Sequence, residues 1–211
     1  MKLYSGIGPS ARTVRMFLAE KQLEIETVEV NLMRSEHLSK DFPVSNPGGQ
    51  LPVLELDEGF ILGESLAICD YLEELQPTPA LLGSTAKERA ETRMWCRRID
   101  LRIMEPAIQG FKAAEGYEFF KDRYYLVRSG AEELKTLSRK NLEWLEQQMT
   151  GQQFICGDRF SLADIQLFCF LQHTRGKSSA APDNCPTLNA WFERIRKRES
   201  VARSAHPTEQ K

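Results

Sequence analysis

The sequence predicts a chain of two parts, a small α/β unit followed by a helical unit. In the first 75 residues, short runs with the two-residue period of strands alternate with runs of helical periodicity. Prolines and a glycine interrupt both patterns in "LQPTPALLGSTAKE", and strand patterns almost vanish beyond it. A chain of 211 residues can bury one large or two modest cores, so its length is compatible with two domains.

The first three elements are a strand, a helix and a strand. Residues 2–4 predict a short strand, and residues 11–21 predict a helix whose apolar face carries Val14, Phe17 and Leu18. The basic residues of this helix are expected to face water: Arg12, Arg15 and Lys21. In "ETVEVNL", apolar residues alternate with polar ones, which is the pattern of a half-buried strand.

An irregular segment follows, and after it a hairpin and a helix. "LPVLEL" and "FILG" flank "DEG", where Gly59 can adopt the positive φ that a three-residue hairpin loop needs. A helix is predicted from about Ser65 to Leu75, because Ile68, Leu72 and Leu75 are spaced by four and three residues. The pattern therefore indicates the order β-α-β, an irregular segment, and β-β-α.

The second part is predicted to be all-helical, with the boundary near residues 77–84 and domains at 1–77 and 84–211. Helices are expected over 86–115, 118–149, "FSLADIQLFCFL" and 188–198. Ser161-x-x-Asp164 is close to a capping box, in which each side chain accepts a hydrogen bond from the other residue's backbone N–H. The apolar run after it is typical of a helix buried in the centre of a bundle.

Composition narrows the possible function classes. A net charge of −2 and a pI near 6.0 give no overall attraction to nucleic acid or anionic lipid, so neither is expected as a partner. No apolar run has the length of a membrane span or a secretory signal, so we expect a cytoplasmic location. The five cysteines and three histidines are widely spaced, so we expect reduced, packed cysteines and no metal site.

Two short motifs carry candidate chemistry. Leu51-Pro52 precedes a strand, and a cis bond there would turn the Leu51 N–H and C=O outward to pair with an extended peptide. A trans proline at the start of an edge strand is the simpler alternative. Glu64 and Ser65 stand at the start of a predicted helix, where Ser65 is either an N-cap or part of a site for a bound carboxylate.

The combination of motifs resembles the glutathione transferase family over almost the whole chain. The resemblance is carried, in this order, by "PSARTVRMFLAEK", "SEHLSKDFPVSNPGGQLPVLEL", "LGESLAICDYLEE" and "FSLADI". It implies an α/β thioredoxin-like N-terminal domain of order β-α-β-α-β-β-α and an all-α helical C-terminal domain. It also implies binding of glutathione, a small peptide with two carboxylates, an amine and a thiol.

The resemblance implies a glutathione site built from His37, Lys40, Gln50, Leu51, Pro52, Glu64 and Ser65. The Leu51 backbone would pair with the cysteinyl part of glutathione, with Pro52 in the cis form. Glu64 would contact the γ-glutamyl amine and Ser65 its carboxylate, and Gln50 is a further contact. His37 matches a histidine near the glycyl carboxylate, where Leu38 replaces the usual lysine and shifts the role toward Lys40. A solvent-facing His37 is the alternative.

The group that activates the thiol is left open. Many family members place a Ser, Tyr or Cys near the loop before the first helix, but Gly8 stands where the serine of the pattern would be. The remaining candidates are Ser10, Ser5, Tyr4 and the backbone N–H groups of Ser10, Ala11 and Arg12. Ser10 has an alternative role as the helix N-cap. Some members with a similar "GP" loop use only the helix end and water.

The resemblance places the second substrate between the two domains. Met104, Ile108 and Phe111 are spaced to line a wall for a flat apolar electrophile, or instead to fill an interdomain core. The expected function is conjugation of the glutathione thiolate to small apolar electrophiles in detoxification, by a homodimer with glutathione as co-substrate and no cofactor. The alternatives are a glutathione-binding module without catalysis and a glutathione-dependent peroxidase or isomerase.

Overall fold

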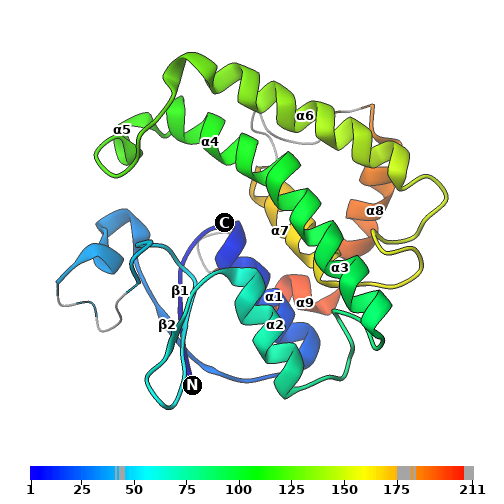
Figure 1. The fold of residues 1–211 in the computed structure, drawn as a ribbon, viewed down its shortest axis with the longest axis horizontal. Coiled ribbons are helices and arrows are strands. Elements are labelled where there is room, and N and C mark those ends of the chain that lie inside the picture. Colours follow the sequence, from blue (N-terminus) through cyan, green and yellow to red (C-terminus); the bar gives the residue numbers. More distant parts are fainter. Residues whose placement is uncertain (41, 43–45, 175–181, 183, 207–211) are drawn as a thin grey trace. The chain divides into compact units, whose positions relative to one another are not determined.

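A computed structural model of the chain describes residues 1–40, 42, 46–174, 182 and 184–206 (Figure 1). The chain forms two compact units. Unit 1 comprises Met1–Arg89 together with Arg196–Lys211, and unit 2 comprises Ala90–Ile195. The C-terminal end of the sequence therefore belongs to the unit that contains its N-terminus.

Unit 1 is built on a four-stranded sheet of order β2-β1-β3-β4. Its strands are β1 (Lys2–Ser5), β2 (Glu26–Glu29), β3 (Val53–Glu55) and β4 (Ile61–Leu62). β2 runs parallel to β1, whereas β3 and β4 extend the sheet in antiparallel fashion. Helices α1 (Pro9–Lys21) and α2 (Ser65–Leu75) lie side by side (Figure 1). Gly59 in the β3–β4 turn has a φ of 82°, as predicted.

The core of unit 1 is formed by apolar side chains of the sheet and of both helices. Fully buried members are Leu3, Val14, Phe17, Val53, Leu54, Ile68 and Leu72. Between β2 and β3, where the family resemblance implied a helix, the described residues form two 3-10 turns, η1 (Leu32–Arg34) and η2 (Glu36–Leu38). Asn31 caps the first turn with its side chain, and Ser35 ends it in a left-handed conformation with φ of 55°.

The expectation that Arg12 and Lys21 face water is wrong. Lys21 is 1% exposed, and its Nζ forms an ion pair with Glu73 and donates to the Gln76 carbonyl oxygen at 2.6 Å. Glu73 in turn accepts from the Leu82 N–H at 2.9 Å. Burying a cation costs free energy unless it is paired and hydrogen-bonded, and these partners supply both. The ion pair and hydrogen bond of Lys21 therefore hold the last turn of α1 against the end of α2 and the segment that follows it.

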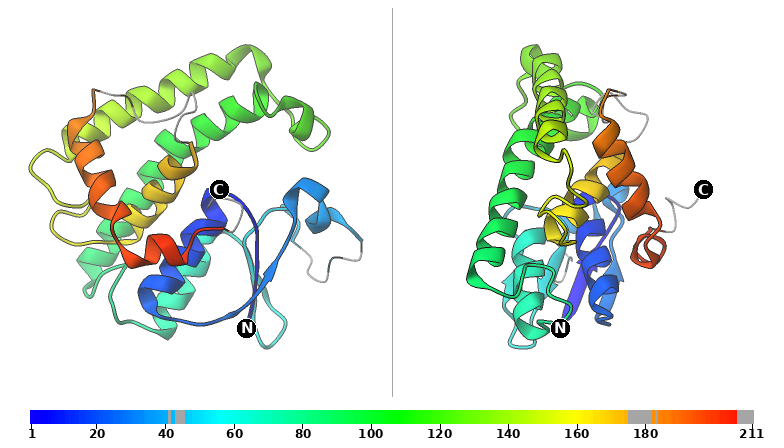
Figure 2. Two further views of the ribbon diagram at one scale, coloured as in Figure 1. Left: turned by 180° about the vertical axis from the view of Figure 1, so that it is seen from behind. Right: turned by 90° about the vertical axis from the view of Figure 1, so that its right-hand side faces the viewer.

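A short helix that the sequence did not predict, α9 (Glu199–Arg203), follows the last predicted helix and packs on α1 (Figure 2). These contacts place the C-terminal residues in unit 1. The sequence-based ranges of 1–77 and 84–211 instead group them with the helices of the second part. The physical reason is that polar contacts to α1 hold this segment, and the apolar periodicity used for the prediction does not detect such contacts.

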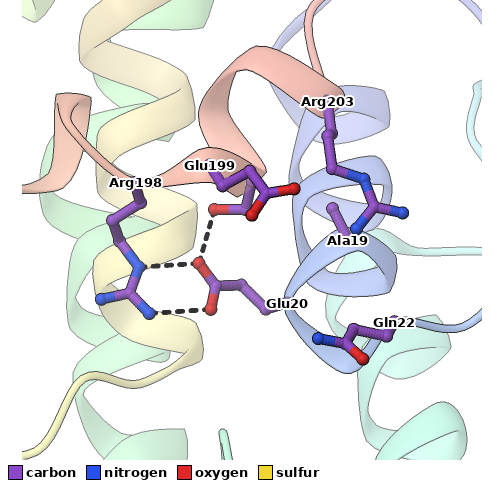
Figure 3. Close-up of a pocket in the computed structure, with 7 residues that line it drawn as sticks. Ala19, Glu20, Gln22, Arg198, Glu199 and Arg203 are labelled. Atoms are coloured by element: carbon purple, nitrogen blue, oxygen red, sulfur yellow. Dashed lines mark hydrogen bonds and ion pairs between the residues drawn. The ribbon is translucent and has the colours of Figure 1, made fainter.

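Two sets of hydrogen bonds hold α9 on α1. Arg12 is 5% exposed and donates from Nη2 to the Val201 carbonyl oxygen at 3.2 Å. Glu20 accepts two hydrogen bonds from Arg198, at 2.7 and 2.8 Å, and one from the Ser200 hydroxyl (Figure 3). A bidentate arginine–carboxylate pair fixes the orientation of the two side chains as well as the distance between them. The last turn of α1 and the start of α9 are therefore held as one piece.

Unit 2 is helical, as predicted. It contains most of α3 (Ala86–Ile99), a π-helical turn (Asp100–Met104), α4 (Glu105–Ala113), α5 (Tyr117–Phe120), α6 (Ala131–Gln148), α7 (Leu162–Thr174) and α8 (Pro186–Arg196). The predicted helix over 86–115 contains the π turn because Pro106 has no N–H for the carbonyl four residues before it, and its ring crowds that carbonyl. The Glu105 N–H bonds instead to the Asp100 carbonyl, five residues back.

The predicted helix over 118–149 is broken into α5 and α6. Side chains of the connecting segment pack on one another: the Phe120 and Tyr124 rings are 6.0 Å apart, and Lys112 Nζ lies 4.1 Å from the Tyr124 ring centroid. A 3-10 turn that ends at Gly130 then leads into α6. These ring and cation contacts add to the backbone turn that the Tyr124 N–H closes on the Phe120 carbonyl at 3.1 Å.

Asp164, near the start of α7, joins three segments of unit 2. Its buried carboxylate accepts from the N–H and the hydroxyl of Ser161, both at 2.9 Å, from the Ile155 N–H at 2.9 Å, and from Trp191 Nε1 at 2.8 Å. Burial raises the pKa of Asp164, and the hydrogen bonds from these donors oppose that shift. Only half of the predicted capping box is present, because the Asp164 N–H bonds to the Ser161 carbonyl and not to its hydroxyl.

All five cysteines are buried and carry free thiols, in agreement with the expectation that they pack in the core. Burial raises the pKa of Cys96 and that of Cys185, the latter to about 11. Thiols with raised pKa values are weak nucleophiles at neutral pH. Among the described residues, no helix is both long and apolar enough to cross a membrane.

We expect Asp164→Ala to lower the free energy of unfolding by about 3 kcal/mol or more, because the buried donors of Ile155 and Trp191 lose their acceptor. Asp158→Ala is the matched control, since Asp158 is exposed, and it should change the free energy of unfolding by less than about 0.5 kcal/mol. Chemical denaturation measures both. Similar losses in the two variants would contradict the assigned role of Asp164.

The contact between Glu20 and α9 should depend on pH. Burial disfavours the charged form of Glu20, but hydrogen bonds from Arg198 and Ser200 outweigh it and lower the pKa of the carboxyl. A lowered pKa stabilises the folded state above the unfolded pKa, and this contribution is lost as pH falls through the folded pKa. We expect Glu20→Gln to cost about 1 to 2 kcal/mol of unfolding free energy at pH 7. In denaturation at falling acidic pH the difference from wild type should shrink as the Glu20 carboxylate becomes protonated, and a difference that stays constant with pH would refute this account.

Candidate functional site

Three turns of unit 1 meet at one end of the sheet. In the β1–β3 register Tyr4 pairs with Val53, so the loop after β1 lies beside Leu51-Pro52. In the β3–β4 register Leu54 pairs with Leu62, which brings the turn before α2 to the same end. β2 runs parallel to β1 and ends there as well. The sheet thus brings together the three motifs that the sequence singled out, namely the loop before α1, Leu51-Pro52 and Glu64-Ser65.

Two glycines shape the loop between β1 and α1. A Cβ on Gly6 would lie 2.8 Å from the Val30 carbonyl oxygen, so only glycine fits against the chain that leaves β2. Gly8 is the N-cap of α1 with a φ of 129°, which residues with side chains rarely adopt. Pro9 follows as the first helical residue, where its missing N–H removes no helical hydrogen bond. Gly8 therefore cannot supply a hydroxyl to the site, but it allows the backbone conformation that starts α1.

Two backbone N–H groups are available at the start of α1. The Arg12 N–H already donates to the Gly8 carbonyl oxygen at 3.0 Å, so the expectation that it serves a ligand is not supported. The N–H groups of Ser10 and Ala11 have no backbone acceptor within the described part of the chain. Ser10 is not the N-cap, because Gly8 holds that position. A pair of N–H groups at a helix N-terminus is a favourable site for an anion.

The other candidate hydroxyls are engaged elsewhere. The Ser5 hydroxyl is fully buried and accepts from Arg15 Nη1 at 2.9 Å. The Tyr4 hydroxyl donates to Glu55 at 3.0 Å, and burial together with this hydrogen bond raises the pKa of Tyr4. The Tyr4 hydroxyl already donates its proton to Glu55, so it is not available to donate a hydrogen bond to a thiolate. Ser10 is therefore the one remaining hydroxyl among the candidates that the sequence gave.

Leu51 presents its backbone outside the sheet. The Leu51-Pro52 bond is cis, which confirms the prediction. The β1–β3 ladder begins at Val53, so the N–H and C=O of Leu51 take no part in it. The Leu51 side chain packs under the loop, with Cδ1 3.4 Å from the position that a Cβ on Gly6 would occupy. The Leu51 backbone is thus held beside the start of α1.

Asn46 is a shaping residue that the sequence analysis missed. Its Nδ2 donates to the Gln50 carbonyl oxygen at 2.7 Å, and its Oδ1 accepts from the Gly48 N–H at 3.2 Å. The same oxygen lies 3.9 Å from the position of a Cβ on Gly63, next to Glu64. The signal in the sequence was "NPGG", because asparagine before a Pro-Gly turn commonly hydrogen-bonds to the backbone of that turn.

Glu64 is a non-glycine residue with a positive φ, at 63°, and a ψ of 116°. It is the N-cap of α2, which corrects the expectation that Ser65 holds this position. The Glu64 carbonyl accepts the Ile68 N–H at 3.0 Å, which is the first helical hydrogen bond of α2. A side chain in this region of φ and ψ costs of order 1 to 3 kcal/mol and is typical of functional sites. The exposed Glu64 carboxylate and Ser65 therefore stand at a second helix N-terminus.

The residues expected near the glycyl carboxylate differ in exposure. His37 in η2 is 8% exposed, so the solvent-facing alternative is wrong. Lys40 and Gln50 are exposed. η2 follows β2, whose C-terminal end lies at the site end of the sheet. Contacts of these three side chains with glutathione stay a prediction.

The residues expected to contact the electrophile all belong to unit 2. Met104 ends the π turn and is 5% exposed, Ile108 on α4 is half-buried, and Phe111 is 38% exposed. The Phe111 ring lies 6.4 Å from that of Phe120 in an edge-on arrangement. Phe111 is the most exposed of the three side chains, so it is the best placed to touch a ligand. The site for the electrophile stays a prediction.

Comparison with known proteins identifies the family. Residues 7–75 match the family model "Glutathione S-transferase, N-terminal domain", and residues 111–199 match "Glutathione S-transferase, C-terminal domain". The chain is 30% identical over 201 residues to "Glutathione S-transferase 2" of Saccharomyces cerevisiae, covering 92% of this chain and 84% of that protein. The chain belongs to the glutathione S-transferase family. The N-terminal match includes all three turns at the site end of the sheet.

Two further similarities concern the fold and a second activity within the family. The crystal structure of Gtt2 from Saccharomyces cerevisiae superposes on this chain with a TM-score of 0.87 at 29% identity, covering 97% of this chain and 100% of that one. This confirms the thioredoxin-like and helical parts of the predicted glutathione S-transferase fold. The chain is also 33% identical to "Maleylacetoacetate isomerase" of Pseudomonas aeruginosa, covering 100% of this chain and 97% of that protein.

The positive φ of Glu64 predicts that glycine is more stable than alanine at this position, the reverse of the usual order. Glycine inside a structured segment normally destabilises a protein relative to alanine. At Glu64, glycine relieves the positive φ, so Glu64→Gly should be more stable than Glu64→Ala by about 1 kcal/mol or more. Both variants lose the carboxylate and should weaken glutathione binding equally. Denaturation curves and glutathione titration measure the two effects, and a less stable Glu64→Gly would contradict the assigned conformation.

Proposed function

We propose that this glutathione S-transferase joins the thiolate of glutathione to small apolar electrophiles. The observation that carries the proposal is that two helix N-termini and the backbone of Leu51, which takes no part in the β1–β3 ladder, meet at one end of the sheet. An extended peptide with carboxylates and a thiolate matches this arrangement, because helix N-termini favour anions and an unpaired strand backbone favours another extended backbone. Glutathione is the co-substrate, and the proposal involves no further cofactor.

Each part of glutathione has a proposed partner. The cysteinyl backbone pairs with the N–H and C=O of Leu51, and Pro52 holds this segment. The γ-glutamyl carboxylate binds at the start of α2 near Ser65, and the Glu64 carboxylate pairs with the γ-glutamyl amine. Gln50 adds a contact to this end, and His37 and Lys40 take the glycyl carboxylate, as the family resemblance implies. Oppositely charged groups therefore face each other at both ends of the ligand.

The sulfur is proposed to lie at the start of α1, near the N–H groups of Ser10 and Ala11. A helix N-terminus contributes roughly 0.3 to 1 kcal/mol per exposed charge and up to about 2 kcal/mol when partly buried. One pKa unit corresponds to about 1.36 kcal/mol, so the dipole alone lowers the thiol pKa by about one unit. Direct hydrogen bonds from the two N–H groups supply the remainder. Proton loss from sulfur is then the step that the chain promotes, and the thiolate attacks the electrophile.

The remaining parts of the proposal concern the second substrate and the assembly. An electrophile with a flat apolar body suits contact with Phe111, Ile108 and Met104, and detoxification is the expected role. The family resemblance favours a cytoplasmic homodimer. Sedimentation of the purified chain at micromolar concentration measures its mass directly, and a monomer would exclude the homodimer.

A glutathione-dependent isomerase is a second candidate, favoured by the full-length similarity to the maleylacetoacetate isomerase of Pseudomonas aeruginosa. The same thiolate would add to a conjugated double bond and leave after rotation about the resulting single bond, so the two activities share one glutathione site. A panel of aryl halides, isothiocyanates, hydroperoxides and cis-configured unsaturated diketo acids separates conjugation, peroxidase and isomerase activity. Turnover of the last class alone would favour the isomerase.

We expect the pKa of bound glutathione to lie well below that of free glutathione, as measured by thiolate absorbance against pH. An unshifted pKa would refute the transferase proposal and favour a binding module without catalysis.

Because the proposed donors are backbone groups, Ser10→Ala should retain most of kcat/KM, within about threefold. If the Ser10 hydroxyl held the thiolate instead, its loss would cost about 10-fold or more, the worth of a hydrogen bond to a charged group.

A further inference from the structure

Arg15 connects the C-terminal segment to the loop before α1. Its Nε donates to the Ser204 carbonyl oxygen at 2.9 Å. From the same guanidinium, Nη1 donates to the Ser5 hydroxyl at 2.9 Å and to the Gly6 carbonyl oxygen at 2.8 Å. These acceptors are 189, 10 and 9 residues away along the sequence. One planar cation therefore joins the end of the chain to its beginning.

The acceptors of Arg15 lie at the loop that sets the position of the proposed thiolate donors. Gly6 is already confined, because the Val30 carbonyl oxygen would be 2.8 Å from its Cβ position. Only Ile7, Gly8 and Pro9 separate Gly6 from Ser10. Gly8 alone in this stretch has a φ, at 129°, that gives the backbone unusual freedom. An anchor on Gly6 therefore limits where the Ser10 and Ala11 N–H groups can stand.

Ser204, the acceptor of Arg15 in the C-terminal segment, is itself held in place. Ser204 is fully buried at the end of α9, and its N–H and hydroxyl bond to the carbonyls of Ser200 and Val201. Ser200 is in turn bound to Glu20 on α1 (Figure 3). The Ser204 carbonyl thus offers Arg15 an acceptor held by a rigid segment and not by a loose chain end.

We propose that Arg15 is a positioning residue for the glutathione thiolate, and that the C-terminal segment completes the glutathione site through it. The proposal rests on the proposed transferase function. Arg15 touches neither sulfur nor electrophile in this account. It acts through Gly6 and Ser5, which hold the loop so that the Ser10 and Ala11 N–H groups point at the sulfur.

The shape of the guanidinium distinguishes this role from a general effect of positive charge. Arginine presents several N–H groups in a fixed plane and can serve three acceptors in different directions, whereas lysine carries a compact charge on a flexible stem. If positioning matters, Arg15→Lys keeps the charge and still loses the effect. If only the positive potential matters, Arg15→Lys restores it.

The test measures the pKa of glutathione bound to wild type, Arg15→Gln and Arg15→Lys, by thiolate absorbance and by the pH profile of kcat/KM. We expect both variants to raise the bound thiol pKa by about 0.5 to 1 unit, which lowers kcat/KM about 3- to 10-fold below that pKa. Ser5→Ala removes one acceptor only and should give a smaller shift in the same direction. It also serves as the mild variant if the Arg15 variants do not fold.

Glu20→Gln is a comparison variant, because it weakens the attachment of α9, which carries Ser204, without touching the loop (Figure 3). It should lower the melting temperature and raise the bound thiol pKa by less than Arg15→Gln does, because the contacts of Arg15 with Ser5 and Gly6 stay in place. A wild-type pKa in Arg15→Gln, or full rescue in Arg15→Lys, would overturn the proposal, and so would an unshifted pKa in Ser5→Ala where the Arg15 variants do not fold. Absence of any pKa depression in the wild-type complex would instead refute the transferase function, so the two failures are distinguishable.

Discussion

The antiparallel pairing of β1 with β3 is the interaction on which the rest of the glutathione site depends. With Tyr4 opposite Val53, the loop that opens α1 stands beside Leu51-Pro52, and β4 brings Glu64 to the same end. A slip of one residue in either ladder would send the strand side chains to opposite faces and move these turns apart. The proposed donors are backbone groups, whose positions follow from the fold itself. A site of this kind tolerates a glycine where a catalytic serine was expected.

Buried and half-buried charges in unit 1 join distant segments. Lys21 fixes the segment after α2 through Glu73, and Glu20 fixes α9 through Arg198. Arg15 joins the chain end to the loop at Ser5 and Gly6. Buried pairs of this kind add little net stability compared with apolar packing, but losing one partner is costly because the other charge stays buried. We therefore assign them mainly to positioning, and they place the C-terminal residues in unit 1.

Local patterns sufficed for much of the fold and for part of the site. The helix over Ser65–Leu75 matched its prediction, and the cis form of Leu51-Pro52 followed from the family motifs. Contacts between residues far apart in sequence were beyond such patterns. The periodicity assigned Arg12, Arg15 and Lys21 to solvent, but partners from residues 73–82 and 198–204 cover their side chains. The positive φ of Glu64 was also missed, since a Ser at the next position is the more common N-cap.

The central claim is that backbone N–H groups at the start of α1 hold the glutathione sulfur while the Leu51 backbone holds its cysteinyl part. The most direct measurement is a crystal structure of the chain with glutathione bound. The account predicts the sulfur within hydrogen-bonding distance of the Ser10 or Ala11 nitrogen, with the Leu51 N–H and C=O paired to the ligand. A sulfur held by a side chain away from α1, or a ligand that leaves the Leu51 backbone unpaired, would contradict it.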